Sequence, residues 1–149
     1  MNDMTGLGGL LAFVTGWFVA QVGKLIGDLI RNKGHMSAQE VFDCFFRSGG
    51  MPSGHTASFT GLTVFFMSKF GIFAPISVLA LCMTIIVVYD AVNVRYAVGE
   101  QGKLLNIMAE SDHNKKTRKM KVVEGHTVPQ AIVGGLLGIG IGLLMSLCF

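Results

Sequence analysis

Charged residues are scarce in this chain of 149 residues: Asp, Glu, Lys and Arg make up 14% of it, whereas hydrophobic residues make up 51%. Soluble domains carry nearer a quarter charged residues. The composition therefore argues against a soluble globular domain and predicts an integral membrane protein.

Cysteine is also sparse, and its placement excludes a disulfide framework. Cys44, Cys82 and Cys148 are odd in number, far apart, and set in or beside apolar stretches. We interpret them as small hydrophobic residues rather than as disulfide or metal ligands. The N-terminus has no basic segment and no obvious cleavage site, so we do not expect a signal peptide.

Four apolar runs are long enough, or nearly so, to cross a hydrocarbon core about 30 Å thick. They cover about residues 7–30, 55–70, 74–94 and 129–149. In the last run, Gly134, Gly138 and Gly142 share one helical face, which suits close packing of helices in lipid. We expect one all-α integral membrane domain over residues 1–149, a helical bundle with about four transmembrane spans plus one or two interfacial helices.

The segments between the spans differ in character. Residues 37–47 place apolar side chains at positions 41, 42, 45 and 46, which predicts a short interfacial helix. Residues 98–125 form a longer polar connection, whose part 102–109 is compatible with a helix. The charged run 111–121 is either a solvated loop against anionic lipid head groups or an element that steers substrate.

Basic residues gather at one end of the expected spans. Nearly all of them lie in or beside the two longer connections, and only Lys69 lies at the opposite end. The positive-inside tendency then places both connections in the cytoplasm and both termini outside. We expect a multi-pass protein of the cell membrane whose functional site faces the cytoplasm.

The segment SGGMPSGHTA, residues 48–57, joins a glycine-rich turn to the start of an apolar run. Ser53 is expected to cap a helix that carries His55 in its first turn. A helix N-terminus is electropositive and binds phosphate. A proton-carrying imidazole beside such a site, at the edge of a membrane span, predicts chemistry on a phosphate carried by a lipid.

Charged residues near the ends of two other spans have two interpretations. Lys24, Asp28 and Arg31 form a stripe at the end of the first span. They mark a functional site, or the two cations snorkel with Asp28 as their counter-ion. Asp90 and Arg95, five residues apart and therefore not stacked on an α-helix, belong either to a structural ion-pair network or to the site.

His126 lies just before the fourth span. Alone it would be an ordinary loop histidine. At a depth matching that of His55, however, the two imidazoles would divide the roles of nucleophile and general acid.

The tetrapeptide PSGH at residues 52–55, with Lys24 and Arg31 spaced K-x6-R upstream and His126 downstream, resembles the type 2 phosphatidic acid phosphatase superfamily. That superfamily also includes vanadium-dependent haloperoxidases. The blocks SGGMPSGHTA, YDAVNVRYAVGEQGKLLN and EGHTVPQAIVGGLLG look like its divergent, small bacterial-type membrane branch. The resemblance covers about residues 21–142.

The resemblance implies a role for each motif residue. The phosphate oxygens would be held by Lys24, Arg31, the Ser53 hydroxyl and the Gly54 amide. His55 would protonate the leaving lipid alcohol, and His126 would attack phosphorus to form a phosphohistidine that water then hydrolyses. The mechanism requires no metal or other cofactor.

The third motif departs from the superfamily pattern SR-x5-H-x3-D. Met120 stands where the Arg is expected and Gln130 where the Asp is expected, and in the first motif Arg31 is followed by Asn32 instead of Pro. Arg95 would replace the missing Arg. A carboxylate that orients His126 would come from Asp90 or Glu124, and depth favours Asp90.

The sequence thus predicts a membrane lipid phosphatase, a phosphoric ester hydrolase acting on a phosphomonoester or pyrophosphate of a membrane-embedded lipid. The alternative is a non-catalytic membrane protein that binds or translocates lipid phosphate. A haloperoxidase-like enzyme and a purely structural subunit rank lower. The expected partners are a lipid phosphate substrate and membrane lipids, with no nucleic acid. A homo-oligomer is compatible with four short spans that need not enclose a pocket alone.

Overall fold

The computed structural model describes residues 3–46, 49–111, 122 and 125–149. Every regular element within these residues is helical. In chain order they are α1 (Asp3–Arg31), α2 (Ala38–Phe46), α3 (Gly54–Phe70), α4 (Pro75–Tyr89), the π-helical turn η1 (Asp90–Val94), α5 (Arg95–Ser111) and α6 (Val128–Cys148). This architecture confirms the expected all-α membrane bundle.

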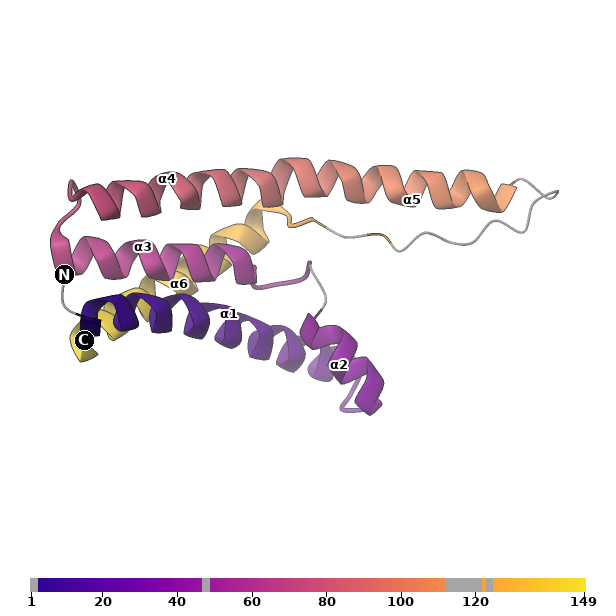
Figure 1. The fold of residues 1–149 in the computed structure, drawn as a ribbon. Helices are drawn as coiled ribbons and strands as arrows, with labels where there is room; N and C mark the ends of the chain where they lie inside the picture. Colours follow the sequence, from indigo (N-terminus) through magenta and orange to yellow (C-terminus); the bar gives the residue numbers. More distant parts are fainter. Residues whose placement is uncertain (1–2, 47–48, 112–121, 123–124) are drawn as a thin grey trace.

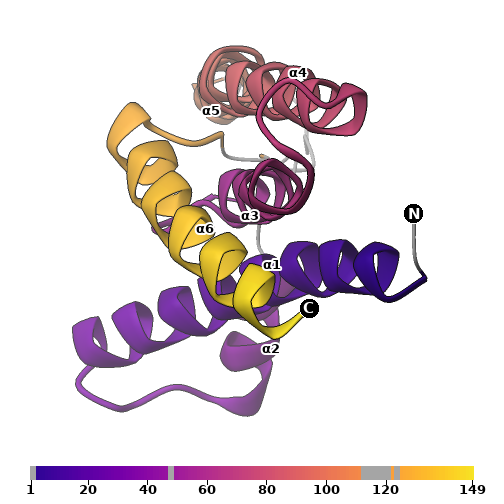
Figure 2. The same cartoon turned by 90° about the vertical axis from the view of Figure 1, so that its left-hand side faces the viewer.

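Helix α3 is the centre of the bundle. Figure 2 shows it between α4 and α1, with α6 passing alongside. Helix α6 comes close because its glycines face α3: a Cβ added at Gly138 would lie 2.5 Å from the carbonyl oxygen of Ala57, and one at Gly142 would lie 2.5 Å from that of Gly61. The glycine stripe expected to pack tightly therefore does so.

Three helices are long and apolar enough to cross a membrane within the described residues: Met4–Arg31, Pro75–Ser111 and Val128–Cys148. Helix α3 has 17 residues, which gives it a length of about 25 Å. That length is at the lower limit for a membrane span. Helices α1, α3, α4 and α6 correspond to the four expected apolar runs; in Figure 1, α4 runs along α3, and α6 crosses behind α3 at an angle.

We expected the third span to end near residue 94, and this expectation is wrong. It continues through η1 into α5, which projects beyond the rest of the bundle (Figure 1). The reason is the lack of a strong stop signal, because no proline stands between Pro75 and Pro129. The expected helix over residues 102–109 is thus part of α5. The charged residues from 112 to 121 lie outside the described part of the chain.

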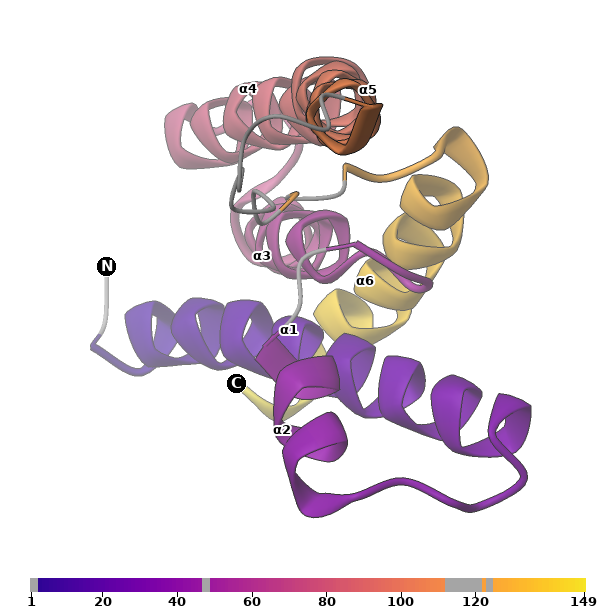
Figure 3. The same cartoon turned by 90° about the vertical axis from the view of Figure 1, so that its right-hand side faces the viewer.

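Helix α2 confirms the short helix expected over residues 37–47. Ser37 and Glu40 cap its start reciprocally, with the Glu40 carboxylate accepting from the Ser37 amide at 2.7 Å. The helix lies beside the end of α1 (Figure 3), where the Gln21 side-chain amide donates to the carbonyl of Phe45 at 2.7 Å. Trp17 and Phe45 meet edge to face.

The two termini lie at one end of the bundle, and the starts of α3 and α6 lie at the other (Figure 1). The candidate residues at the end of α1, in η1 and at the starts of α3 and α6 therefore share one end. Which end faces the cytoplasm stays a prediction.

Candidate functional site

The start of α3 is fixed by Ser53. Its hydroxyl oxygen accepts from the Thr56 amide at 3.3 Å and from the Thr56 hydroxyl at 3.0 Å, so Ser53 is the helix N-cap that we expected. Ser53 is fully buried, so the structure explains its hydroxyl as a cap. A contact of Ser53 or of the Gly54 amide with phosphate stays a prediction. His55 follows in the first turn and is partly buried.

The start of α6 lies against the start of α3. Thr127 caps α6 in a reciprocal capping box with Gln130, and Pro129 occupies the first turn as expected. The Ser53 amide donates to the carbonyl of Gln130 at 3.1 Å. This backbone hydrogen bond ties the two helix starts together, although they are far apart in the sequence.

Two imidazoles meet at this junction. The ring centroids of His55 and His126 are 6.2 Å apart, and the ring planes are inclined at 64°. His126 is buried. The rings are close enough to face a single phosphoryl group.

The loop that carries His126 is docked onto the π-helical turn. The His126 amide donates to the carbonyl of Ala91 at 3.0 Å. The preceding residue, Gly125, lies so close to the backbone of Arg95 and Tyr96 that a Cβ there would collide with it. A residue without a side chain is therefore needed at position 125.

The same turn corrects our expectation for Asp90 and Arg95. Nε of Arg95 donates to Oδ2 of Asp90 at 2.6 Å. Five residues would not stack on an α-helix, but the wider π turn brings positions i and i+5 together. The structure therefore pairs the two residues beside the docked His126 loop.

Positive charge surrounds the two histidines. Lys24 is only 6% exposed, and its charge acts on both rings. Arg95 and Asp90 also act on His55. Burial lowers the pKa of His126 below its ordinary 6.5, and the Lys24 ammonium lowers it further, while hydrogen bonds to Gln130 and to the Gly50 backbone oppose the shift. The His126 imidazole is therefore neutral, and nucleophilic, at pH 7.

Comparison with known proteins shows the family to which the chain belongs. The model of the family described as the Divergent PAP2 family matches residues 8–141. The chain belongs to this family. It is 27% identical over 116 residues to the uncharacterized membrane protein YuiD of Bacillus subtilis (strain 168), a match that covers 68% of this chain and 73% of that protein. No solved structure matches the chain.

The resemblance inferred from the motifs is thereby confirmed at the level of the family. The chain is a multi-pass membrane protein of the Divergent PAP2 family. The matched region includes every candidate site residue, from Lys24 to Gln130.

One residue of the PAP2-like first motif lies apart from the buried group. Arg31 is two turns beyond Lys24, about 10 Å along α1. Its side chain is 80% exposed and lies 3.8 Å from Oδ1 of Asp28. Asp28 thus serves Arg31 as a counter-ion, so the snorkelling interpretation fits Arg31 but not Lys24, which is buried. A contact between Arg31 and phosphate stays a prediction.

The third PAP2-like motif departs from the pattern at the residue that meets His126. Oε1 of Gln130 lies 3.4 Å from Nδ1 of His126. Asp90, which we favoured for this role, pairs with Arg95 instead, and Glu124 lies outside the described residues. Gln130 stands where the motif has its Asp, and we expected the orienting carboxylate to come from another residue instead. The motif spacing pointed to this position, and the T-x-x-Q capping box explains why its side chain turns back toward His126.

Proposed function

We propose that this protein is a membrane lipid phosphatase that hydrolyses a phosphomonoester or pyrophosphate of a membrane-embedded lipid. The observation that carries the proposal is the meeting of His55 and His126 beside the buried Lys24. Membership of the Divergent PAP2 family supports the same reaction class.

The first step would transfer the phosphoryl group to His126. In the tautomer whose Nδ1 carries the proton and donates to the Gln130 oxygen, Nε2 holds the free lone pair. Nε2 attacks phosphorus, the bond from phosphorus to the lipid oxygen breaks, and His55 donates its proton to that oxygen.

The second step would release inorganic phosphate. Neutral His55 accepts a proton from a water molecule while the oxygen of that water attacks phosphorus. The bond between phosphorus and Nε2 of His126 breaks. His55 is then protonated and ready for another cycle. The chain's own residues balance the protons, so no metal or cofactor enters the scheme.

The negative charge of the transition state would be stabilised by the cations at this end of the bundle. Lys24 would act as a point charge from α1, and Arg95 would offer a planar guanidinium from the π turn. Asp90 would orient Arg95 through the 2.6 Å hydrogen bond. The N-terminus of α3 would add its dipole and free amides.

The second candidate is a membrane protein that binds or translocates lipid phosphate without hydrolysing it. The observation that favours it is the contact of His126 with an amide, Gln130, instead of a carboxylate. A neutral amide stabilises an imidazolium less than a carboxylate does.

Purified protein in lipid nanodiscs, assayed for phosphate release from a panel of lipid phosphates, separates the two candidates. The phosphatase predicts turnover that vanadate inhibits, and loss of turnover in His55→Ala and in His126→Ala. Full turnover in both variants would refute the proposed roles. Saturable lipid phosphate binding without release would favour the second candidate.

We also propose that the site lies on the cytoplasmic side and that both termini lie outside. The basic residues of the two longer connections support this orientation. Single cysteines introduced at positions 103 and 5, labelled in intact cells with an impermeant reagent, test it. Labelling at position 103 and protection at position 5 would reverse the orientation.

A further inference from the structure

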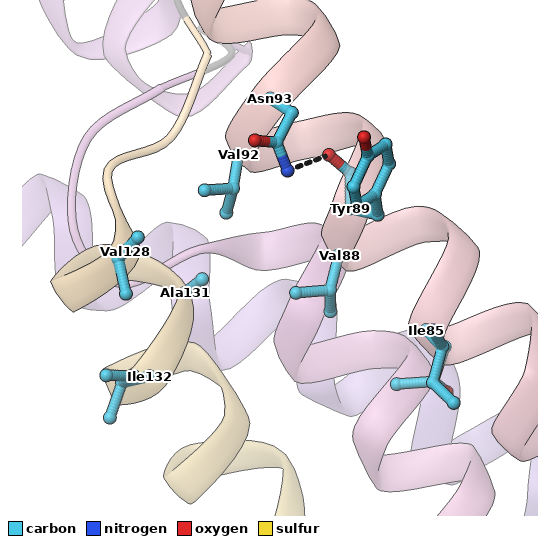
Figure 4. Close-up of a pocket in the computed structure, with 9 residues that line it drawn as sticks. Ile85, Val88, Tyr89, Val92, Asn93, Val128, Ala131 and Ile132 are labelled. Atoms are coloured by element: carbon cyan, nitrogen blue, oxygen red, sulfur yellow. Dashed lines mark hydrogen bonds between the residues drawn. The ribbon is translucent and has the colours of Figure 1, made fainter.

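An apolar groove runs along the bundle between α4 and α6. Its volume is about 500 Å³, and Ile85, Val88 and Val92 line it on one side, with Val128 and Ile132 on the other. Figure 4 shows Val88 and Val92 pointing toward α6. The hydroxyl of Thr84, deeper in the lining, is already bonded within α4 and to α3, so the groove presents hydrocarbon.

One end of this groove is lined by residues next to those that hold the His126 loop. Val92 directly follows Ala91, whose carbonyl accepts from the His126 amide, and Val128 stands two residues after His126. The polar side chain at this end is Asn93, which donates to the carbonyl of Tyr89 at 3.3 Å (Figure 4). The groove therefore changes from polar to apolar in the direction that leads away from the histidines.

We propose that this groove holds one hydrocarbon chain of the lipid whose phosphate lies at His55 and His126, an inference that rests on the proposed function for the position of the phosphate. At roughly 30 Å³ for a group the size of a water molecule, 500 Å³ is the space of about 17 such groups, on the scale of one long hydrocarbon chain. A second chain, in a lipid that has one, would lie outside the groove in the bilayer.

The chains of bulk lipids do not displace the substrate's chain from the groove, because the bound phosphate holds the substrate's chain next to it. Once the head group is bound at the histidines, the attached chain reaches the adjacent groove as an intramolecular event with a high effective concentration. The groove then needs only a shape that fits the chain.

A bulky residue in the groove tests the proposal. Ile132→Trp fills the groove from an exposed position on α6, and Leu143→Trp, on the same face three turns further along, is the matched control. With hexadecyl phosphate, Ile132→Trp is expected to raise KM severalfold, because the indole occupies the space of the chain. With butyl phosphate neither variant changes KM. An equal change for both substrates, or none, would overturn the proposal.

A second readout does not depend on turnover. Hexadecyl phosphate carrying a photoreactive diazirine near the chain end, cross-linked to the wild-type protein in nanodiscs, is expected to label the groove residues of α4 and α6. Unlabelled hexadecyl phosphate, but not hexadecanol, should compete. If this labelling occurs without phosphate release, the phosphatase proposal fails and the groove assignment stands. Uniform labelling of all the lipid-facing helices would contradict the assignment. So would disulfide cross-linking of the Ile132→Cys variant between two copies of the chain.

Discussion

The side-chain oxygen of Gln130 meets His126 and caps α6 at the same time: it lies 3.4 Å from Nδ1 of His126 and accepts from the Thr127 amide at 3.0 Å. One atom thus closes the first helical turn and orients the candidate nucleophile. The amide oxygen can accept a hydrogen bond from the Nδ1–H group, but it adds no negative charge. Position 130 is therefore where the protonation of His126 can be altered without disturbing the fold.

Gln130→Glu is expected to raise the pKa of His126, because a carboxylate within about 4 Å favours the imidazolium. Glutamate preserves the capping box, so α6 keeps its start. The charge would also stabilise the phosphohistidine-forming transition state and increase kcat. Titration of ¹³C-labelled histidines by NMR measures the pKa, with His126→Gln identifying the signal. Gln130→Ala, which removes both the cap and the charge, should neither raise the pKa of His126 nor increase kcat. An unchanged pKa of His126 in Gln130→Glu would disprove the contact.

The rate should depend on pH through His126. Burial, and then Lys24, lower the pKa of His126 below 6.5, so the acid limb of the kcat/KM profile lies below pH 6.5, where Nε2 becomes protonated. Lys24→Gln removes a positive charge and raises the pKa, so the acid limb of the profile moves to higher pH, in addition to any loss of phosphate affinity. Profiles of the two proteins with the same substrate check this. Acid limbs that coincide would show that Lys24 does not act on His126.

The same shift has a consequence for stability. Since the folded-state pKa of His126 lies below the unfolded value of 6.5, the unfolded chain binds more protons between the two values. The contribution to stability is complete above about pH 6.5 and is lost as the pH falls through the folded pKa. Thermal unfolding of wild-type and His126→Gln proteins should therefore differ more in pH dependence below pH 6.5 than above it.

Gly125→Ala should displace His126 from the site. The new methyl group would collide with the backbone of Arg95 and Tyr96, which cannot move as a side chain can. We expect a loss of turnover of at least about tenfold, since small displacements of reacting groups are costly. Gly27→Ala, a helical position with open space around it, is the control and should keep its activity. Wild-type turnover in Gly125→Ala would mean that the loop does not need its docked position.

Gly138→Ala should weaken the packing of α6 on α3. A methyl group there would lie 2.5 Å from the Ala57 carbonyl oxygen, and overpacking of this kind costs about 1–3 kcal/mol. Gly140→Ala points into open space and should be neutral or stabilising. The free energy of unfolding in mixed detergent micelles compares the two variants. Equal stabilities would contradict the close approach of the helices.

Local signals predicted the parts of this structure that depend on neighbours in sequence. Ser53 could be predicted as a cap because a serine hydroxyl at a helix start reaches an amide three residues on. Pro129 indicated the start of α6. The α6 glycine stripe was visible from its four-residue spacing. Each of these features depends on helical geometry alone.

The remaining features depend on a departure from that geometry or on tertiary contacts. The pairing of Asp90 with Arg95 needs a π turn, and no residue in the segment 90–94 is a sequence signal for such a turn. Lys24 and Arg31 share one face of α1, but only Lys24 lies where α3 begins and is buried. The close approach of Gly125 to the backbone of Tyr96 exists only once α5 continues from α4.

The most direct test is to look for phosphate on His126. Protein mixed with a lipid phosphate, stopped within one turnover at alkaline pH where phosphohistidine survives, is digested and analysed by mass spectrometry. We expect phosphate on the peptide that contains His126, and none in His126→Gln. Phosphate on another residue, or lipid hydrolysis with no phosphorylated peptide at any time, would contradict His126 as the nucleophile.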